Sequence, residues 1–231
     1  MGSTMSFTAA GDCFITRRLP GRSESFFEIS SIIKKGEARF MNLEVTVHDH
    51  EGYPSAVCGG TWAMALPEVL NDLKDYGFNL VAWANAVIGH GQHVLRGIEI
   101  YHKCPIFYSL GNFIFQNETV TSLPQDFYDS YGLGYTCSIA DALDIRSDNN
   151  KRGFGMKPNV WQTVIPFWTM EDGELKDLTL YPVELGFDQP RYRRGWPEVS
   201  QSTEILEKIR KLSLPFGTCI EIDNCTGKVR L

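Results

Sequence analysis

The sequence lacks any concentration of positive charge. Its 22 basic residues are outnumbered by 28 acidic ones, the formal net charge is -6, and no run of Lys or Arg is longer than a pair. Binding of nucleic acid or of an anionic membrane surface requires clustered positive charge. We therefore expect no nucleic-acid partner, and the acidic balance favours a cation ligand or a small substrate.

Long apolar stretches and a basic leader are also missing. No window approaches the ~18 apolar residues of a membrane span, and the start "MGSTMSFTAAGD" does not have the pattern of a signal peptide. We expect no membrane segment in this chain and a cytoplasmic location for the chain as given. Because Met1–Thr4 have the composition of an added leader, a removed secretion or anchor segment stays open as an alternative.

The six cysteines do not form a C-x-x-C pair or the spacing of a small disulfide scaffold. This pattern predicts small buried side chains in a reducing compartment. The cysteines are Cys13, Cys58, Cys104, Cys137, Cys219 and Cys225.

Strands and helices alternate in the first half of the chain. Apolar side chains at helical spacing predict helices, and short apolar runs closed by turn residues predict strands. Such alternation is typical of a mostly parallel sheet covered by helices. The expected strands are 6–12, 38–44, 80–85 and 87–89, and the expected helices are 24–37 and 66–79.

The second half predicts an antiparallel sheet, because its short strands are separated by turn sequences. Between the halves, residues 117–160 are polar and aromatic and include an expected exposed loop at 146–153. We predict one α/β domain over 1–231, with a parallel half at about 6–116 and an antiparallel half at about 160–231. The later strands are expected at 161–168, 174–185, 217–223 and 228–231, with one helix at 202–213.

Polar side chains follow four of the expected strands. In a parallel sheet the loops at the carboxyl ends of the strands form the ligand crevice. Carboxylates, an amide oxygen and two imidazoles are a ligand mixture suited to Zn, Mn, Fe or Mg. Taken singly, each residue also fits a turn, a helix cap or a surface position. The residues are Asp12, Asn42, Glu44, Asn85, His90 and His93.

Several segments together resemble the CapA family of bacterial capsule or poly-γ-glutamate synthesis proteins. They include "GDCFI", "FMNLEVTV" and "VIGHGQHVLRGIEIYHKCPIFYSLGNFIF", and the match covers most of 6–116 and 160–231. The G-H-x-x-H-x-x-x-G-x-E pattern followed by Y-S-L-G-N-F is its most specific part. The resemblance implies a calcineurin-like metallophosphoesterase fold, a sandwich of two mixed sheets flanked by helices that usually binds two divalent metal ions.

The resemblance also assigns roles to single positions. It implies Asp12, Glu44, Asn85, His90 and His93 as metal ligands, with His90, His93 and Asp12 taking part in catalysis. It places Asn112 near the site, although a turn residue with left-handed geometry is the stronger interpretation. An arginine segment falls where the family carries basic residues that meet an anionic substrate, and a solvated loop is the alternative. This segment contains Arg191, Arg193 and Arg194.

The chain departs from the family pattern after Asn85. Ala86 and Val87 follow directly, and a further histidine motif of the family is absent. If 80–85 and 87–89 are parallel neighbours, they need a crossover of about a dozen residues or more, and one connecting residue spans only ~3.6 Å. We therefore expect that a central segment is lacking after residue 86.

The resemblance favours a metal-dependent hydrolase or transferase that acts on a phosphoester or a γ-glutamyl amide. An anionic small molecule or poly-γ-glutamate polymer is the expected partner, together with proteins of a synthesis complex. Family members can be membrane-anchored or extracellular. The alternative is a catalytically inactive binding or scaffold domain in a polymer synthesis or export assembly, which the absent histidine motif favours.

Overall fold

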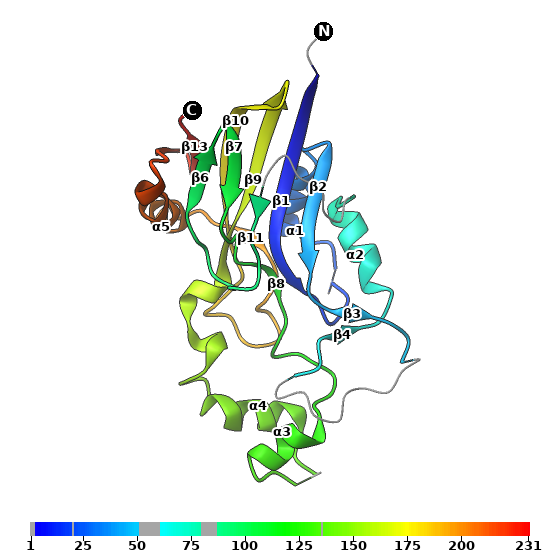
Figure 1. Ribbon diagram of the computed structural model, residues 1–231. Coiled ribbons are helices and arrows are strands. Elements are labelled where there is room, and N and C mark those ends of the chain that lie inside the picture. Colours follow the sequence, from blue (N-terminus) through cyan, green and yellow to red (C-terminus); the bar gives the residue numbers. More distant parts are fainter. Residues whose placement is uncertain (1–2, 20, 51–60, 80–86, 135) are drawn as a thin grey trace.

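A large mixed β-sheet forms the centre of the molecule in the computed structural model, which describes residues 3–19, 21–50, 61–79, 87–134 and 136–231 (Figure 1). Six strands follow the order β12-β13-β10-β9-β1-β2, with β8 beside β1 and β11 beside β10. The strands are β1 (Thr4–Phe14), β2 (Ala38–Leu43), β8 (Asn112–Phe115), β9 (Gln162–Glu171), β10 (Glu174–Glu184), β11 (Glu198–Val199), β12 (Ile220–Asp223) and β13 (Thr226–Val229).

Strand direction changes at β1. This strand pairs in parallel with β2 and β8 and antiparallel with β9. The partners beyond β9 are all antiparallel. The structure is thus a mixed α/β fold with one large mixed sheet and flanking helices, which confirms the α/β class expected from the sequence, whereas the metallophosphoesterase-like sandwich of two mixed sheets stays a prediction.

Helices α1 (Glu24–Ile33) and α2 (Val69–Tyr76) cover one face of the sheet. Helix α1 begins where the Ser23 hydroxyl accepts a hydrogen bond from the backbone N–H of Phe26, and its apolar positions recur at helical spacing. Helix α2 ends at Gly77, which has a φ of 108°. The buried side chains of both helices join one core cluster, which includes Phe26, Ile29, Ile33, Val69, Leu73 and Tyr76.

The other face of the sheet packs against α5 (Glu204–Ser213) and a small three-stranded sheet, as Figure 1 shows. The small sheet has the order β5-β7-β6, with β5 at Val87–Ile88, β6 at Ile98–Tyr101 and β7 at Cys104–Phe107. A two-stranded pair, β3 (Thr46–Val47) and β4 (Met64–Ala65), lies beyond β2. The second core cluster includes Leu95, Ile98, Phe107, Trp168, Leu178 and Ile209.

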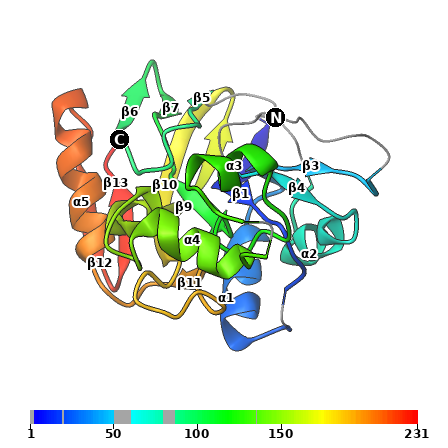
Figure 2. The same cartoon turned by 90° about the horizontal axis from the view of Figure 1, so that it is seen from below.

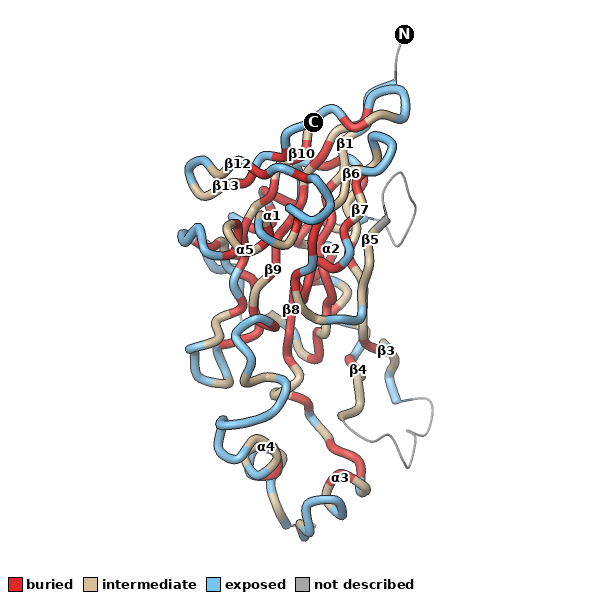
Figure 3. Tube along the Cα trace, turned by 60° about the vertical axis from the view of Figure 1, so that its left-hand side comes forward, coloured by how far each residue is buried: buried red, intermediate tan, exposed pale blue. Residues whose placement is uncertain are grey.

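The segment between β8 and β9 contains helices that the sequence did not predict. Helices α3 (Gln125–Ser130) and α4 (Ile139–Ser147) are followed by the short turns η1 (Phe154–Met156) and η2 (Pro158–Trp161). Helix α4 buries only Ala142 and Leu143, so its sequence has little apolar periodicity. The two helices lie beneath the carboxyl ends of β1 and β8 (Figure 2), and this part of the chain is the more exposed (Figure 3).

The cysteine prediction was correct only in part. The structure describes five of the six cysteines, and these five are free. Cys13 is buried, and burial raises the pKa of its thiol. Cys219 is exposed and the other three are half-buried, because they lie in turns and at strand ends.

Two expectations concern residues outside the described ranges. The strand at 80–85, which includes Asn85, belongs to them, and so does the first half of the junction at Ala86. Among the residues that the structure does describe, no helix is long and apolar enough to cross a membrane. The longest of these helices have ten residues, whereas a span needs ~20.

Gly11 of β1 lies against the backbone of Leu110 and Gly111, the residues that precede β8. A Cβ atom at this position would lie 2.0 Å from the carbonyl oxygen of Gly111. We expect Gly11→Ala to lower the free energy of unfolding by about 3 kcal/mol, because both backbones would have to move apart. Denaturant unfolding measures this loss. Gly134→Ala is the matched control, since the nearest atom to its added Cβ is 4.0 Å away, and an equal loss in both variants would contradict the prediction.

Candidate metal centre

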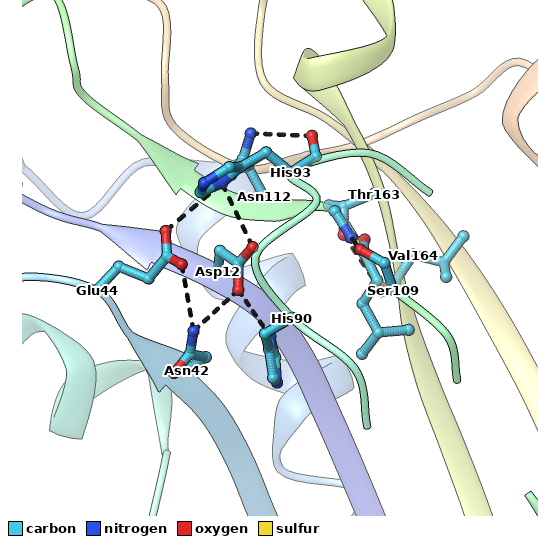
Figure 4. A network of polar contacts seen from close by, with 11 residues as sticks. Asp12, Asn42, Glu44, His90, His93, Ser109, Asn112, Thr163 and Val164 are labelled. Carbon is cyan, nitrogen blue, oxygen red and sulfur yellow. Dashed lines mark hydrogen bonds and ion pairs between the residues drawn. The ribbon is translucent and has the colours of Figure 1, made fainter. Parts of the chain in front are cut away.

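Three polar residues form a row across three parallel strands, near the carboxyl ends of β1 and β2 and at the first residue of β8. Asp12 of β1 pairs with Asn42 of β2 on one side and with Asn112 of β8 on the other. The backbone N–H of Asp12 donates to the carbonyl of Gly111 at 2.8 Å, which fixes this register. The row places the Asp12 carboxylate between two amide side chains (Figure 4).

The carboxyl of Asp12 is fully buried and nevertheless has a lowered pKa. Its Oδ1 accepts hydrogen bonds from His90 Nδ1 at 2.7 Å and from Asn42 Nδ2 at 3.0 Å. Burial alone would raise the pKa of the Asp12 carboxyl. The hydrogen bonds from His90 and Asn42, with the nearby charge of His93, outweigh burial and hold that pKa below its usual value.

Glu44 follows β2 and brings a second carboxylate to the same place. Its Oε2 lies 3.5 Å from His93 Nδ1, and its Oε1 accepts a long hydrogen bond of 3.4 Å from Asn42 Nδ2. Burial and the negative charge of Asp12 both raise the pKa of the Glu44 carboxyl. Two partly dehydrated carboxylates therefore repel each other here, and a bound cation relieves that repulsion.

The two histidines come from the loop that follows β5. Gly91 has a φ of 86° and His93 a φ of 55°, so the loop bends back and both rings point toward Asp12 (Figure 4). A left-handed backbone at a histidine is uncommon and persists where the surroundings fix it. Here an isolated bridge between Leu95 and Leu110 anchors the far end of the loop.

Three oxygen atoms surround one ring nitrogen of His93. Its Nδ1 lies 2.9 Å from Asn112 Oδ1 and 3.4 Å from Asp12 Oδ2, in addition to the contact with Glu44. Asn112 Nδ2 donates to the carbonyl of Val160 at 2.8 Å, so the amide oxygen of Asn112 is the atom that faces His93. Asn112 thus sets the orientation of the His93 ring.

The donor set fits a divalent metal ion. Asp12, Glu44 and His93 each offer one ligand atom, and these atoms lie within 4.8 Å of one another. Asp12 Oδ2 and His90 Nε2 are buried and have no hydrogen-bond partner among the described residues. The Nδ1 of His90 forms a hydrogen bond with the Asp12 carboxylate. Histidines that bind metal commonly donate one ring nitrogen to a carboxylate in this way and bind the ion through the other, which here is Nε2. The mixture of carboxylate and imidazole suits Zn, Mn, Fe or Mg.

The arginines that the resemblance singled out lie elsewhere among the described residues. Arg191 pairs with Asp144 of α4 at 2.5 Å. Arg194 is nearly buried, pairs with Glu118 and lies over the ring of Trp161. Arg193 lies over Tyr192 and lines a hollow of about 790 Å³ beside α1. None of the three forms a hydrogen bond or ion pair with Asp12, Glu44, His90 or His93, so their contact with substrate stays a prediction.

Two further side chains border the centre: Asn42, which the sequence had indicated as a strand-end residue, and Phe154, which it had not. Asn42 bridges the two carboxylates, a role signalled by its place at the end of the same strand that carries Glu44. Phe154 belongs to η1, which follows α4, and its ring centroid lies 5.6 Å from that of His93. No sequence signal links Phe154 to His93, because 60 positions separate them and the contact depends on how the α3–α4 segment folds back.

Comparison with known proteins gives several partial matches. The family model described as "Bacterial capsule synthesis protein PGA_cap" matches residues 82–117, which include His90, His93 and Asn112. Two uncharacterized proteins of Sinorhizobium fredii, y4sH and y4uA, are each 38% identical over 160 residues, covering 65% of this chain and 34% of the relative. The match therefore spans about a third of the length of these relatives.

A further relative carries a functional name. The "PGA biosynthesis protein CapA" of Bacillus subtilis is 56% identical over 34 residues, which cover 15% of this chain and 9% of that protein. The family model and this match agree with the motifs around the histidine loop. These partial matches, which for the family model span residues 82–117, make the chain similar to CapA-like bacterial capsule synthesis proteins.

Proposed function

We propose that the chain is a metal-dependent hydrolase or transferase domain of capsule polymer synthesis, which acts on a phosphoester or on a γ-glutamyl amide. The observation that carries the proposal is the convergence of Asp12 and Glu44, at the carboxyl ends of β1 and β2, with His93 of the loop after β5, with ligand atoms within 4.8 Å of one another. Ligand crevices of open α/β sheets lie at this edge. The similarity to CapA-like proteins supports the link to capsule synthesis.

Electrostatics supports a cation at this point. Burial, and next to it the negative charge of Asp12, raise the pKa of the Glu44 carboxyl, so a second carboxylate is costly to hold at this place. Asp12, Glu44 and His93 would hold a divalent ion, which would offset that cost and supply Lewis-acid activation of the group to be cleaved. A second ion, as the family resemblance implies, would use His90 Nε2 and Asn85.

The surrounding side chains orient the ligands and leave one side open. Asn42 and His90 hold the Asp12 carboxylate from the β2 side, and Asn112 holds the His93 ring from the β8 side. His93 retains 30% of its side-chain exposure, so an incoming substrate reaches the centre past this ring. Because their neighbours already hold them in place, the Asp12 carboxylate and the His93 ring need not rearrange during a reaction.

The remaining expectations belong to the same proposal. The architecture is metallophosphoesterase-like, one domain spans 1–231, and a central segment is lacking after residue 86. The substrate is an anionic small molecule or poly-γ-glutamate polymer, and partner proteins of a synthesis complex bind the same chain. Both core clusters contain side chains of β9, Ile165 in one and Val164 and Trp168 in the other, which supports one domain.

Metal analysis with an activity assay tests the proposal. The protein is loaded with Mn, Zn, Fe or Mg, dialysed, and analysed for bound metal. Turnover of an activated phosphodiester and of γ-glutamyl-p-nitroanilide is then measured with and without chelator. We expect stoichiometric metal and chelator-sensitive turnover of one substrate. Turnover that survives complete metal removal would contradict the proposal.

The alternative is a domain that binds polymer or partner without catalysis. The absence from the sequence of the family's further histidine motif favours it. A folded protein that retains poly-γ-glutamate but neither binds metal nor turns over the two substrates would support this alternative and reject the enzyme.

A further inference from the structure

A small cavity lies between the end of α4 and the turn η1. Its volume is about 40 Å³. Arg146 and Ser147 of α4 line it from one side, and Arg152 and Phe154 from the other. The position of α4 beneath the carboxyl ends of the strands can be followed in Figures 1 and 2.

Phe154 connects this cavity to the metal centre. Its ring lines the cavity, and the same ring lies 5.6 Å from the ring of His93 and 5.8 Å from that of Phe115, measured between centroids. The cavity and the candidate ligand His93 therefore both border the same aromatic side chain. A molecule of modest length that passes Phe154 contacts both places.

The cavity is positively charged in a protein whose net charge is -6. Arg146 and Arg152 both line it, and no carboxylate of the described residues lies within 4.0 Å of either guanidinium. The carboxylate that lines the cavity, Glu118, is paired with Arg194. Arg146 is also held in place, because its guanidinium lies 5.7 Å from the ring of Phe127.

Size and charge together define the group that fits. A cavity needs roughly 10–15 Å³ to hold one water molecule, so about 40 Å³ holds a group of about three non-hydrogen atoms. A carboxylate or the oxygen atoms of a phosphate have this size. Planar guanidinium groups bind such oxyanions through paired charge-assisted hydrogen bonds.

We propose that this cavity is an oxyanion subsite, in which Arg146 and Arg152 bind a carboxylate or phosphate group of the substrate while the group to be cleaved lies at the metal centre beyond Phe154. The identification of the bound molecule as substrate rests on the proposed function. Binding of the oxyanion itself does not require metal. The subsite selects substrates that carry a second anionic group apart from the reacting one.

Calorimetric titration of the full chain, after dialysis against chelator, tests the subsite with two probes, inorganic phosphate and glutarate. We expect saturable binding of at least one probe to the wild-type protein, and the stronger probe identifies phosphate or carboxylate as the preferred group. Arg152→Met and Arg146→Met should each raise the dissociation constant about 5- to 20-fold, since each removes a charge-assisted pair.

Lys151→Met is the matched control, because Lys151 is an exposed neighbouring cation that does not line the cavity. Its dissociation constant should stay within about twofold of the wild-type value. Arg152 is exposed, so Arg152→Met keeps the test valid even if Arg146→Met unfolds the α3–α4 segment. No saturable binding to the wild-type protein, or equal weakening by Lys151→Met and Arg152→Met, would overturn the subsite.

Metal content separates this inference from the proposed function. Arg152→Met should bind as much metal as the wild-type protein. If the wild-type protein binds no metal but its affinity for phosphate or glutarate still depends on Arg152, the subsite stands and the hydrolase proposal fails. If metal and turnover are present but the affinity for neither probe depends on Arg152, the hydrolase proposal stands and the subsite is rejected.

Discussion

Replacing His93 with alanine is expected to raise the dissociation constant for the divalent metal at least about 100-fold while the protein stays folded. Loss of a second-shell partner alone typically costs 10–100-fold in metal affinity, and His93 is a direct ligand candidate in the triad. Asp12→Asn should be at least as damaging, because it removes a ligand charge at nearly constant volume. His90→Ala should lower metal occupancy as well. Metal titration monitored by calorimetry, with elemental analysis after dialysis, measures these losses.

His102→Ala is the matched control for this experiment. His102 is exposed, lies in the turn between β6 and β7, and has a left-handed backbone with a φ of 47°, close to that of His93. Any strain that alanine introduces at such a backbone is therefore present in both variants. Metal binding should be unchanged in His102→Ala, and unchanged metal content in both His93→Ala and His90→Ala would reject the site.

Deleting residues 219–231 is expected to abolish folding and to cause aggregation. The deletion removes β12 and β13, whose side chains Ile220 and Val229 are buried in the core cluster beneath α5. Each buried side chain of this size contributes ~1.5–3 kcal/mol, and the β13 ladder with β10 is lost as well. The total approaches the 5–15 kcal/mol net stability of a typical domain. The exposed edge of β10 then offers unpaired backbone groups to other chains.

Size-exclusion chromatography and thermal unfolding check this prediction. Removal of Leu231 alone serves as the control, because this residue is 62% exposed and should leave both measurements unchanged. A 219–231 deletion variant that is monomeric and unfolds cooperatively would show that the hairpin is an appendage and that the domain ends before it.

Much of the local structure follows from local sequence signals. The apolar spacing of α1, α2 and α5 predicts these helices, and Gly77 ends α2 as the sequence indicates. Helix α4 escaped prediction, because it is short and buries only two side chains, so its stability depends on packing rather than on a periodic pattern. The ion pairs of Arg191 with Asp144 of α4 and of Arg194 with Glu118 depend on how the chain between β8 and β9 folds and were equally hidden.

The sequence by itself determined which residue types end the strands, and therefore the candidate metal ligands Asp12, Glu44, His90 and His93. For Asp12 and Glu44 it did so because the carboxyl ends of parallel strands share one edge, a rule that needs no coordinates. His90 and His93 follow β5, which belongs to the separate three-stranded sheet, so only the tertiary structure brings them to that edge. Only the tertiary structure decided the register that aligns Asp12 with Asn42 and Asn112, and the left-handed turn that brings His93 Nδ1 within 3.5 Å of two carboxylates. It also decided the contact between Phe154 and His93. These features depend on distances between segments far apart in the chain, and short-range propensities do not contain such distances.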